Sequence, residues 1–345
     1  MTKIEIIAEI AWGHNGDKKH LLNLLEGAKN GECDWVSIHI TNMSDYMVTY
    51  YGQQQGSVSA GRNVSNVYEY LDKINISKKT WIEFNNRRIK LGLKLMVMPN
   101  DLNSLKFAVE NLNPEAFVLS AASFSEDEMV VALAETKKRI FLRIGGSTIS
   151  EIARVLSFFQ SNDNNDIVLL HGVQNYPTDI SNSFLKDLDK LNSVFGCATG
   201  IADHVDGDDP FAQILPLLAI PFGISFIEKH ITLDRSKMDE DFEAAIEPHE
   251  FLQLKVNVSK TLLALSSSNL VSLPKSALDY RNVSRKKLIL TEDVKQGDVI
   301  MRKHLIFKRS HYGIVIDDLV LVLGSRFNSD YVKNTTLTYD MISYE

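Results

Sequence analysis

The apolar residues of this chain fall into short continuous runs of aliphatic and β-branched side chains, separated by longer amphipathic stretches. Short continuous runs are typical of strands buried on both faces, whereas apolar residues three and four positions apart indicate helices with one buried face. We predict eight strands, at residues 4–10, 35–40, 93–98, 116–120, 140–144, 167–172, 197–202 and 224–230. We predict helices at residues 18–29, 79–91, 102–112, 126–135, 149–160, 182–191, 210–218 and 249–265.

The strict alternation of strand and helix indicates the fold class. Strands joined by a helix lie parallel in one sheet, because each connection must cross that sheet. Eight such units match a (β/α)8 TIM barrel, which takes ~250 residues. A doubly wound open sheet is the alternative. It is less favoured because Gly13-His14-Asn15-Gly16 follows the first strand, where a nucleotide-binding sheet of that kind carries Gly-x-Gly-x-x-Gly.

Two segments interrupt the alternation, and the composition changes after the last helix. Residues 42–75 form a long polar connection, which we expect to be a lid or a binding loop, and residues 234–246 form the second insertion. Beyond the barrel, short strand-like runs replace the helical period. We therefore predict a barrel domain at 1–266, a linker at 267–283 and a small, mostly β domain at 284–345.

Composition and charge restrict the class of protein. Hydrophobic residues make up 44% and charged residues 23%, as in ordinary globular proteins. No apolar run approaches the ~20 residues of a membrane-spanning helix, and the N-terminus lacks the pattern of a signal peptide. The formal net charge is −7 and no basic run stands out. We expect a cytoplasmic protein with no nucleic-acid or membrane partner.

The barrel fold itself selects candidate functional residues, because active residues of TIM barrels lie at the C-terminal ends of the strands and in the loops after them. Glu228 and His230 are two residues apart in one strand and therefore share a face. Imidazole and carboxylate together suit a divalent ion such as Mn, Co, Fe or Zn, with His204 and His230 as ligands. A hydrogen-bonded structural role is the alternative for any single histidine. The residues selected are Glu9, His14, Asn15, His39, Asp101, Arg143, His171, Gln174, Tyr176, Asp203, His204, Glu228 and His230.

Several short segments at strand ends and in the tail form a distinctive series along the chain. They are Ile-Ile-Ala-Glu-Ile at 6–10 with Gly-His-Asn-Gly-Asp at 13–17, His171 with Tyr-Pro-Thr at 176–178, Gly-Ile-Ala-Asp-His at 200–204, Ile-Glu-Lys-His-Ile-Thr-Leu-Asp-Arg at 227–235, and residues 284–309 in the tail. In this order they resemble the sialic acid synthase family, the phosphoenolpyruvate-dependent nonulosonate synthases. The resemblance covers nearly the whole chain, and the C-terminal part of the chain resembles the antifreeze-like (SAF) domain of that family.

The resemblance implies a transferase that forms a carbon–carbon bond. In such a barrel, a divalent metal, typically Mn²⁺ and otherwise Mg²⁺ or Co²⁺, polarises the aldehyde of an open-chain N-acylated hexosamine. The C3 atom of phosphoenolpyruvate attacks that aldehyde, water adds at C2, and phosphate leaves. The implied product is a nine-carbon 2-keto acid.

The resemblance also implies roles for single residues. His204 and His230 match the metal ligands. The expected catalytic carboxylates are Glu9, which handles substrate and proton transfer, and Glu228 and Asp241, which lie on the substrate side. The expected substrate-binding residues are Asn15, His39, Arg143, Gln174, Tyr176 and Arg309. Arg309 matches an arginine that the tail domain of a second subunit inserts into the site, which implies a domain-swapped homodimer.

The departures from the family pattern lie where phosphoenolpyruvate would bind. The second strand carries Ser37 and His39 where the family has Lys and Gln, and the fourth carries Val118 in place of a Lys. Two serines are replaced by Ala121 and Ala202. Each missing charge-assisted hydrogen bond removes roughly 1.5–3 kcal/mol of affinity for a phosphate. Arg143 supplies one replacement cation and His39 a second.

Three functions follow from this pattern. The first is a divergent synthase that holds phosphoenolpyruvate through Arg143 and backbone donors. The second is a metal-dependent barrel enzyme that acts on a related sugar acid without phosphoenolpyruvate. The third is a non-catalytic sugar-binding homologue, which the retained metal residues disfavour. The missing lysines disfavour the first, but we favour it because similarity along the whole chain usually preserves the broad chemistry.

Overall fold

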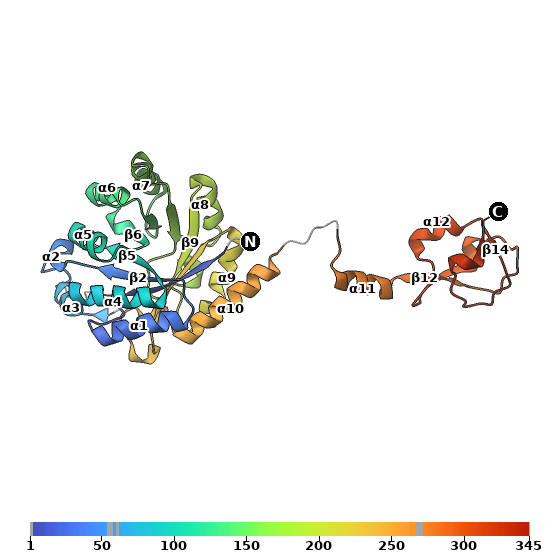
Figure 1. Ribbon diagram of the computed structural model, residues 1–345, viewed down its shortest axis with the longest axis horizontal. Helices are drawn as coiled ribbons and strands as arrows, with labels where there is room; N and C mark the ends of the chain where they lie inside the picture. The colour runs from blue at the N-terminus through green and yellow to red at the C-terminus, as the bar shows by residue number, and fades with distance from the viewer. Residues whose placement is uncertain (1–2, 54–57, 60–61, 267–271, 345) are drawn as a thin grey trace. The chain divides into compact units, whose positions relative to one another are not determined.

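A computed structural model of the chain describes residues 3–53, 58–59, 62–266 and 272–344. The chain divides into two compact units, Met1–Ser266 and Ser267–Glu345 (Figure 1). Each unit has its own hydrophobic core. Within the described ranges, no helix combines the length and the apolar composition needed to span a lipid bilayer.

The first unit is a closed parallel barrel, which confirms the predicted fold class. Each strand pairs with the next along the chain, and β1 pairs with β10 to close the ring. In the described part of the chain the barrel strands are β1 (Glu5–Ala11), β2 (Trp35–Ile40), β5 (Lys94–Pro99), β6 (Ala116–Ser120), β7 (Arg139–Arg143), β8 (Ile167–His171), β9 (Ala198–Asp203) and β10 (Phe226–Ile231). A two-residue strand, β11 (Ala245–Ile246), pairs with β10 outside the ring.

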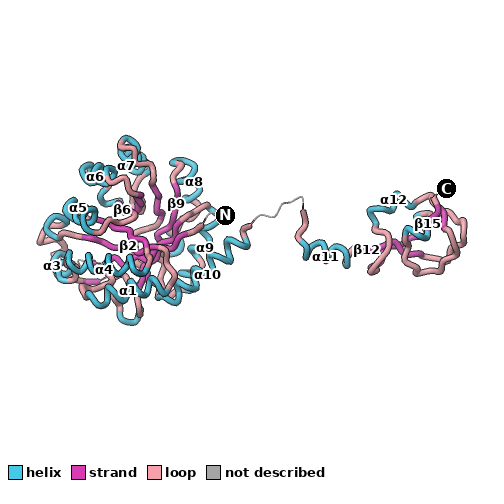
Figure 2. The backbone as a smooth tube through the Cα atoms, in the orientation of Figure 1, coloured by secondary structure: helices cyan, strands magenta, loops and turns pink. Residues whose placement is uncertain are grey.

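Helices lie around the strands, as Figures 1 and 2 show. Each buries one apolar face, and in α1 that face consists of Leu21, Leu24, Leu25 and Ala28. The Asp17 side chain begins α1 by accepting the backbone N–H of His20. The helices between and after the strands are α1 (Lys18–Asn30), α4 (Lys78–Leu91), α5 (Leu102–Asn111), α6 (Asp127–Glu135), α7 (Ile149–Ser161), α8 (Asp187–Phe195), α9 (Leu215–Ala219) and α10 (Pro248–Ala264).

The barrel interior is apolar toward the N-terminal ends of the strands. Trp35, Phe141 and Phe226 contact one another edge to face, with ring centroids 4.9 to 6.5 Å apart. Each aromatic pair contributes roughly 0.5–1.5 kcal/mol beyond the burial of its surface. Two residues further along β7 and β10, on the same face, stand Arg143 and Glu228. The aromatic layer therefore packs directly beneath the polar residues at the C-terminal end of the barrel interior.

The insertion at 42–75 contains α2 (Met43–Tyr46), β3 (Val58–Ser59), β4 (Arg62–Asn63) and α3 (Val67–Lys73). Residues 54–57 and 60–61 of the expected lid or binding loop lie outside the described residues. Met43, Val67, Leu71 and Ile74 form a small core of their own. Sequence reasoning did not predict these helices, because only a few apolar residues bury them and the rest of the segment is polar.

The second unit begins with α11 (Lys275–Ser284), a helix without buried residues where the sequence predicted a plain linker. Strand β12 (Lys286–Leu290) pairs antiparallel with β13 (Leu305–Arg309), and β14 (Arg326–Phe327) with β15 (Ile342–Ser343). A short helix, α12 (Leu319–Val322), lies between the two pairs in the chain. The small β region in the tail agrees with the predicted fold class.

Candidate active site

A cluster of buried charged residues occupies the C-terminal end of the barrel interior. Arg143 of β7 forms ion pairs with Glu9 of β1 and with Glu228 of β10, whose Oε1 lies 2.9 Å from its Nη2. His39 of β2 adds an imidazole, with Nε2 3.7 Å from Glu9 Oε1 and 3.4 Å from Arg143 Nη1. We call these four residues the charged cluster. Four strands contribute to it because the ends of parallel barrel strands converge.

The charged cluster gives its two carboxyl groups different proton affinities. Burial alone would raise the pKa of Glu9, but the Arg143 guanidinium and then His39 lower it to about 2. Burial raises the pKa of Glu228 to about 7, against the opposing effect of Arg143. Burial also lowers the pKa of His39 to about 4, so its imidazole is neutral. At neutral pH, Glu9 is therefore an anion and Glu228 can give up or accept a proton.

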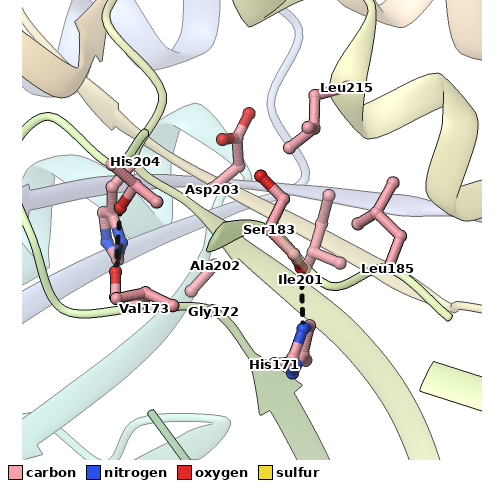
Figure 3. Close-up of a pocket in the computed structure, with 11 residues that line it drawn as sticks. His171, Gly172, Val173, Ser183, Leu185, Ile201, Ala202, Asp203, His204 and Leu215 are labelled. Carbon is pink, nitrogen blue, oxygen red and sulfur yellow. Dashed lines mark hydrogen bonds between the residues drawn. The ribbon is translucent and has the colours of Figure 1, made fainter. Parts of the chain in front are cut away.

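His204 and His230 lie next to each other beside the charged cluster, with ring centroids 5.3 Å apart. The Nδ1 of His204 donates to the carbonyl oxygen of Val173 at 2.9 Å (Figure 3), which leaves Nε2 as the basic nitrogen. Neither ring nitrogen of His230 has a hydrogen-bond partner among the described residues. Burial lowers the pKa of both histidines, that of His204 to about 3. Both are thus in the neutral form that binds metals.

The two histidines fit a metal centre in which the protein supplies few ligands. Asp241 adds a carboxylate whose Oδ2 lies 3.6 Å from His230 Nδ1, and burial raises its pKa to about 7. Among the described residues, no three His, Cys, Asp or Glu side chains are arranged so that they could hold an ion together. Further ligands would therefore come from water or from substrate oxygens, as in catalytic sites that keep open positions.

Tyr176 forms a wall of the histidine site. Its ring centroid lies 4.5 Å from that of His204 and 5.4 Å from that of His230. Its hydroxyl donates to Gln174 Oε1 at 2.8 Å, and the Gln174 side chain is exposed. His171 is also a candidate because it ends β8, but it does not join the two histidines. Its Nε2 donates to the carbonyl oxygen of Ser183 at 3.0 Å across a small cavity (Figure 3).

Asn15 contacts the loop after β10 and not the charged cluster. Its Nδ2 donates to Asp239 Oδ1 at 2.7 Å, and its Oδ1 accepts the backbone N–H of Glu240 at 3.3 Å. The second carboxylate oxygen of Asp239 lies 2.9 Å from His20 Nε2. Sequence reasoning did not select His20 and Asp239, because the two residues are more than 200 positions apart and neither ends a strand.

A buried ion pair lies behind the histidines. Lys229, between Glu228 and His230 in β10, points to the opposite face and places Nζ 2.9 Å from Asp203 Oδ2. Both side chains are almost completely buried, and Asp203 also accepts the backbone N–H of Val205. The pair joins β9 to β10 at the two positions that directly precede His204 and His230 in the chain.

Two of the positions at which this sequence departs from the resembled pattern lie in an apolar part of the barrel interior. Val118 and Ala202 are buried in one cluster with Met96 and Phe141. Arg143, the expected replacement cation, already pairs with two carboxylates. Arg309 belongs to the other unit, where it ends β13 opposite Lys286 with an exposed side chain.

Several known proteins with similar sequences are named as biosynthetic synthases. The pseudaminic acid synthase of Helicobacter pylori is 25% identical over 340 residues, covering 98% of this chain and 97% of its own. The N,N'-diacetyllegionaminic acid synthase of Campylobacter jejuni is 26% identical over 316 residues, covering 91% and 92%. An uncharacterized protein of Methanocaldococcus jannaschii, MJ1065, is 25% identical over 335 residues, covering 97% and 93%.

Solved structures agree with the fold. A crystal structure of N-acetylneuraminic acid (sialic acid) synthetase from Leptospira borgpetersenii, in complex with citrate, superposes with a TM-score of 0.69 at 23% identity. The match covers 82% of this chain and 93% of that one. The sequence pattern of the NeuB family matches residues 24–269, which is most of the barrel. The chain therefore belongs to the NeuB family, whose sialic acid synthase-like members it resembles along nearly its whole length.

Proposed function

We propose that this enzyme is a metal-dependent nonulosonic acid synthase, a transferase that joins phosphoenolpyruvate to an open-chain N-acylated hexosamine. The observation that carries the proposal is the pair of neutral, adjacent imidazoles of His204 and His230 at the barrel mouth. The new bond forms between C3 of phosphoenolpyruvate and the aldehyde carbon. Water then adds at C2 and the bond from C2 to the phosphate oxygen breaks, which releases phosphate.

His204 and His230 would hold the ion, most simply Mn²⁺, with Mg²⁺ or Co²⁺ as alternatives. A divalent ion bound there supplies Lewis-acid activation of the aldehyde oxygen. The protein's own contribution is to keep both rings neutral and fixed. The Val173 carbonyl oxygen holds the His204 ring through Nδ1, and the Tyr176 ring lies against both imidazoles.

The carboxyl groups handle protons in the proposed reaction. Glu228, with a pKa of about 7, accepts a proton from the attacking water at a carboxylate oxygen or returns one to the sugar alkoxide. Glu9 stays ionised beside Arg143 and binds substrate hydroxyl groups as an acceptor. Asp241, at 3.6 Å from His230, borders the same space on the sugar side.

A second candidate function has its own supporting observation. Arg143 is paired with two carboxylates, and Val118 is buried among apolar residues, so few cationic donors remain for a phosphate. Under this alternative the metal centre activates a related sugar acid and no phosphoenolpyruvate binds. Both candidates need the histidine pair, and they differ in the three-carbon substrate.

We further propose that the active form is a domain-swapped homodimer. Arg309 is exposed at the end of β13, and a guanidinium there suits the carboxylate or acylamino oxygens of a substrate. In this arrangement the tail unit of one subunit would complete the barrel site of the other.

The test is a steady-state assay with Mn²⁺, phosphoenolpyruvate and a panel of N-acylated hexosamines. Released phosphate and the mass of the organic product are both measured, and Glu228→Gln is the matched variant. Phosphate released in equal amount to a nine-carbon acid supports the synthase. A sugar that binds without any phosphate release, together with no binding of phosphoenolpyruvate, overturns it in favour of the second candidate.

A further inference from the structure

Three segments far apart in the sequence meet beside His230: the turn at residues 13–16, helix α3, and the loop at 238–241, which we call the acidic turn. We propose that Tyr70 of α3 is a positioning residue that holds the acidic turn, through Glu240, where Asp241 reaches His230. The inference rests on the proposed function, because it takes His230 as part of the metal centre. It assigns a role in that centre to the inserted helix α3.

The acidic turn has a backbone that needs external support. Met238 and Asp241 both have positive φ, 53° and 63°, in the left-handed region that favours glycine. Residues with a side chain remain in that region only where the surrounding structure holds them. Within the turn, the Phe242 N–H donates to the Asp239 carbonyl oxygen at 3.2 Å, but no strand or long helix continues through it.

The first support comes from the turn at residues 13–16. Asn15 bonds both to the Asp239 side chain and to the Glu240 backbone. Gly13 also lies next to the acidic turn, since a Cβ added there would lie 3.4 Å from the Glu240 carbonyl oxygen, at van der Waals contact. The two turns therefore contact each other through their backbones, with Asn15 fixing the register between them.

The second support comes from α3. The Tyr70 hydroxyl donates to Glu240 Oε2 at 2.5 Å, and Glu240 is only 4% exposed. A hydrogen bond from a hydroxyl to a buried carboxylate belongs to the stronger, charge-assisted class. The end of α3 is itself fixed against the first turn, because a Cβ on Gly16 would lie 2.9 Å from Ile74 Cα. Helix α3 thus contacts both turns and links them.

Together these contacts hold the Asp241 carboxylate near His230, with Oδ2 3.6 Å from Nδ1. Asp241 follows Glu240 directly, so a shift of the Glu240 backbone moves the Asp241 carboxylate. Groups that orient the ligands of a metal typically change its affinity by about 10–100-fold when they are removed. Tyr70 acts on Asp241 only through Glu240, so we expect its replacement to weaken Mn²⁺ binding by about tenfold, the lower end of this range.

The experiment compares Tyr70→Phe with Tyr68→Phe in the full-length protein. Tyr68 lies in the same helix, is partly buried like Tyr70, and packs against the small core of the insertion. Hydrogen–deuterium exchange is followed in peptides that cover residues 238–245, and Mn²⁺ affinity is measured by calorimetry. The expected result is faster exchange of these peptides and about tenfold weaker Mn²⁺ binding in Tyr70→Phe alone, with both variants still folded.

The two readouts separate this inference from the proposed function. Exchange of residues 238–245 that is as slow in Tyr70→Phe as in the unmodified protein overturns the positioning role, whatever the metal does. Faster exchange with unchanged Mn²⁺ affinity also overturns it, because the turn would then be free to move without consequence. Absence of Mn²⁺ binding in the unmodified protein counts against the proposed metal centre, while the exchange comparison still decides whether Tyr70 holds the turn.

Discussion

At the scale of single residues, burial determines which groups in the barrel mouth are charged. Arg143 is buried, so solvent screens its pairing little, and it keeps Glu9 ionised although that side chain is fully buried. Glu228 shares the same guanidinium, yet burial leaves it with a pKa of about 7. One cation for two carboxyl groups therefore produces one fixed anion and one group able to exchange a proton.

Replacing Arg143 tests this charge balance. Arg143→Met leaves two buried carboxyl groups without a cation, and we expect it to lower the free energy of unfolding by about 3–5 kcal/mol. Arg139→Met is the matched control in the same strand, because its pair with Asp166 is partly exposed and contributes about 1 kcal/mol or less. Urea unfolding of both variants measures the difference. Equal losses would show that the buried cluster is no more important than a surface pair.

The sequence predicted which residues gather at the barrel mouth but not how they pair. The ends of parallel strands converge, so Glu9, Arg143 and Glu228 were expected in one place. Which of these charged groups form ion pairs depends on the directions of their side chains. The spacing of residues along the sequence does not determine those directions. Arg143 was therefore assigned to substrate, whereas the structure brings it to two carboxylates. Asn15 was assigned to substrate in the same way and contacts the acidic turn.

At the scale of elements, the docking of α3 depends on a glycine. Gly16 has a φ of 76°, and its Cα faces the backbone of Ile74 with no space for a methyl group. Strand and helix alternation predicted the barrel elements because burial on both faces leaves a strong pattern. The same reasoning missed α2 and α3, whose buried residues are few and are separated by polar ones.

Gly16→Ala should therefore destabilise the protein more than an equivalent change elsewhere. Gly92→Ala is the control, since Gly92 has a φ of 71° but no atom within 4 Å of an added Cβ. The control carries only the conformational penalty, about 1–2 kcal/mol, whereas Gly16→Ala adds the displacement of α3. Thermal unfolding followed by circular dichroism compares the two. A melting temperature that falls equally in both variants contradicts the close packing of α3 on this turn.

At the scale of the whole molecule, two units with separate cores share one chain. Because each unit has its own core, the proposed exchange of tail units between two subunits would leave both folds intact. The sequence predicts a domain boundary after residue 266, because the composition and the hydrophobic period change there. The helix α11 was not predicted, since it buries no residue and so leaves no amphipathic pattern.

If the proposed domain-swapped dimer forms, two inactive variants should restore each other's activity when their subunits are mixed. Arg309→Ala and His204→Ala should each be inactive as pure proteins. A mixture refolded together should recover about a quarter of the activity, because mixed dimers contain one site with both residues intact. Lys308→Ala, one position earlier on β13, serves as the control and should retain activity. If the mixture stays inactive while both variants bind partner subunits, Arg309 does not act across a dimer.

The most direct test of the account is calorimetric titration of the purified, metal-free protein with Mn²⁺, alongside His204→Ala. We predict one Mn²⁺ site per chain in the unmodified protein and none in His204→Ala, with both proteins folded to the same melting temperature. A following titration with phosphoenolpyruvate distinguishes the two candidate functions. Equal Mn²⁺ binding by the two proteins, or no binding by either, would contradict the central claim that His204 and His230 form a metal centre at the barrel mouth.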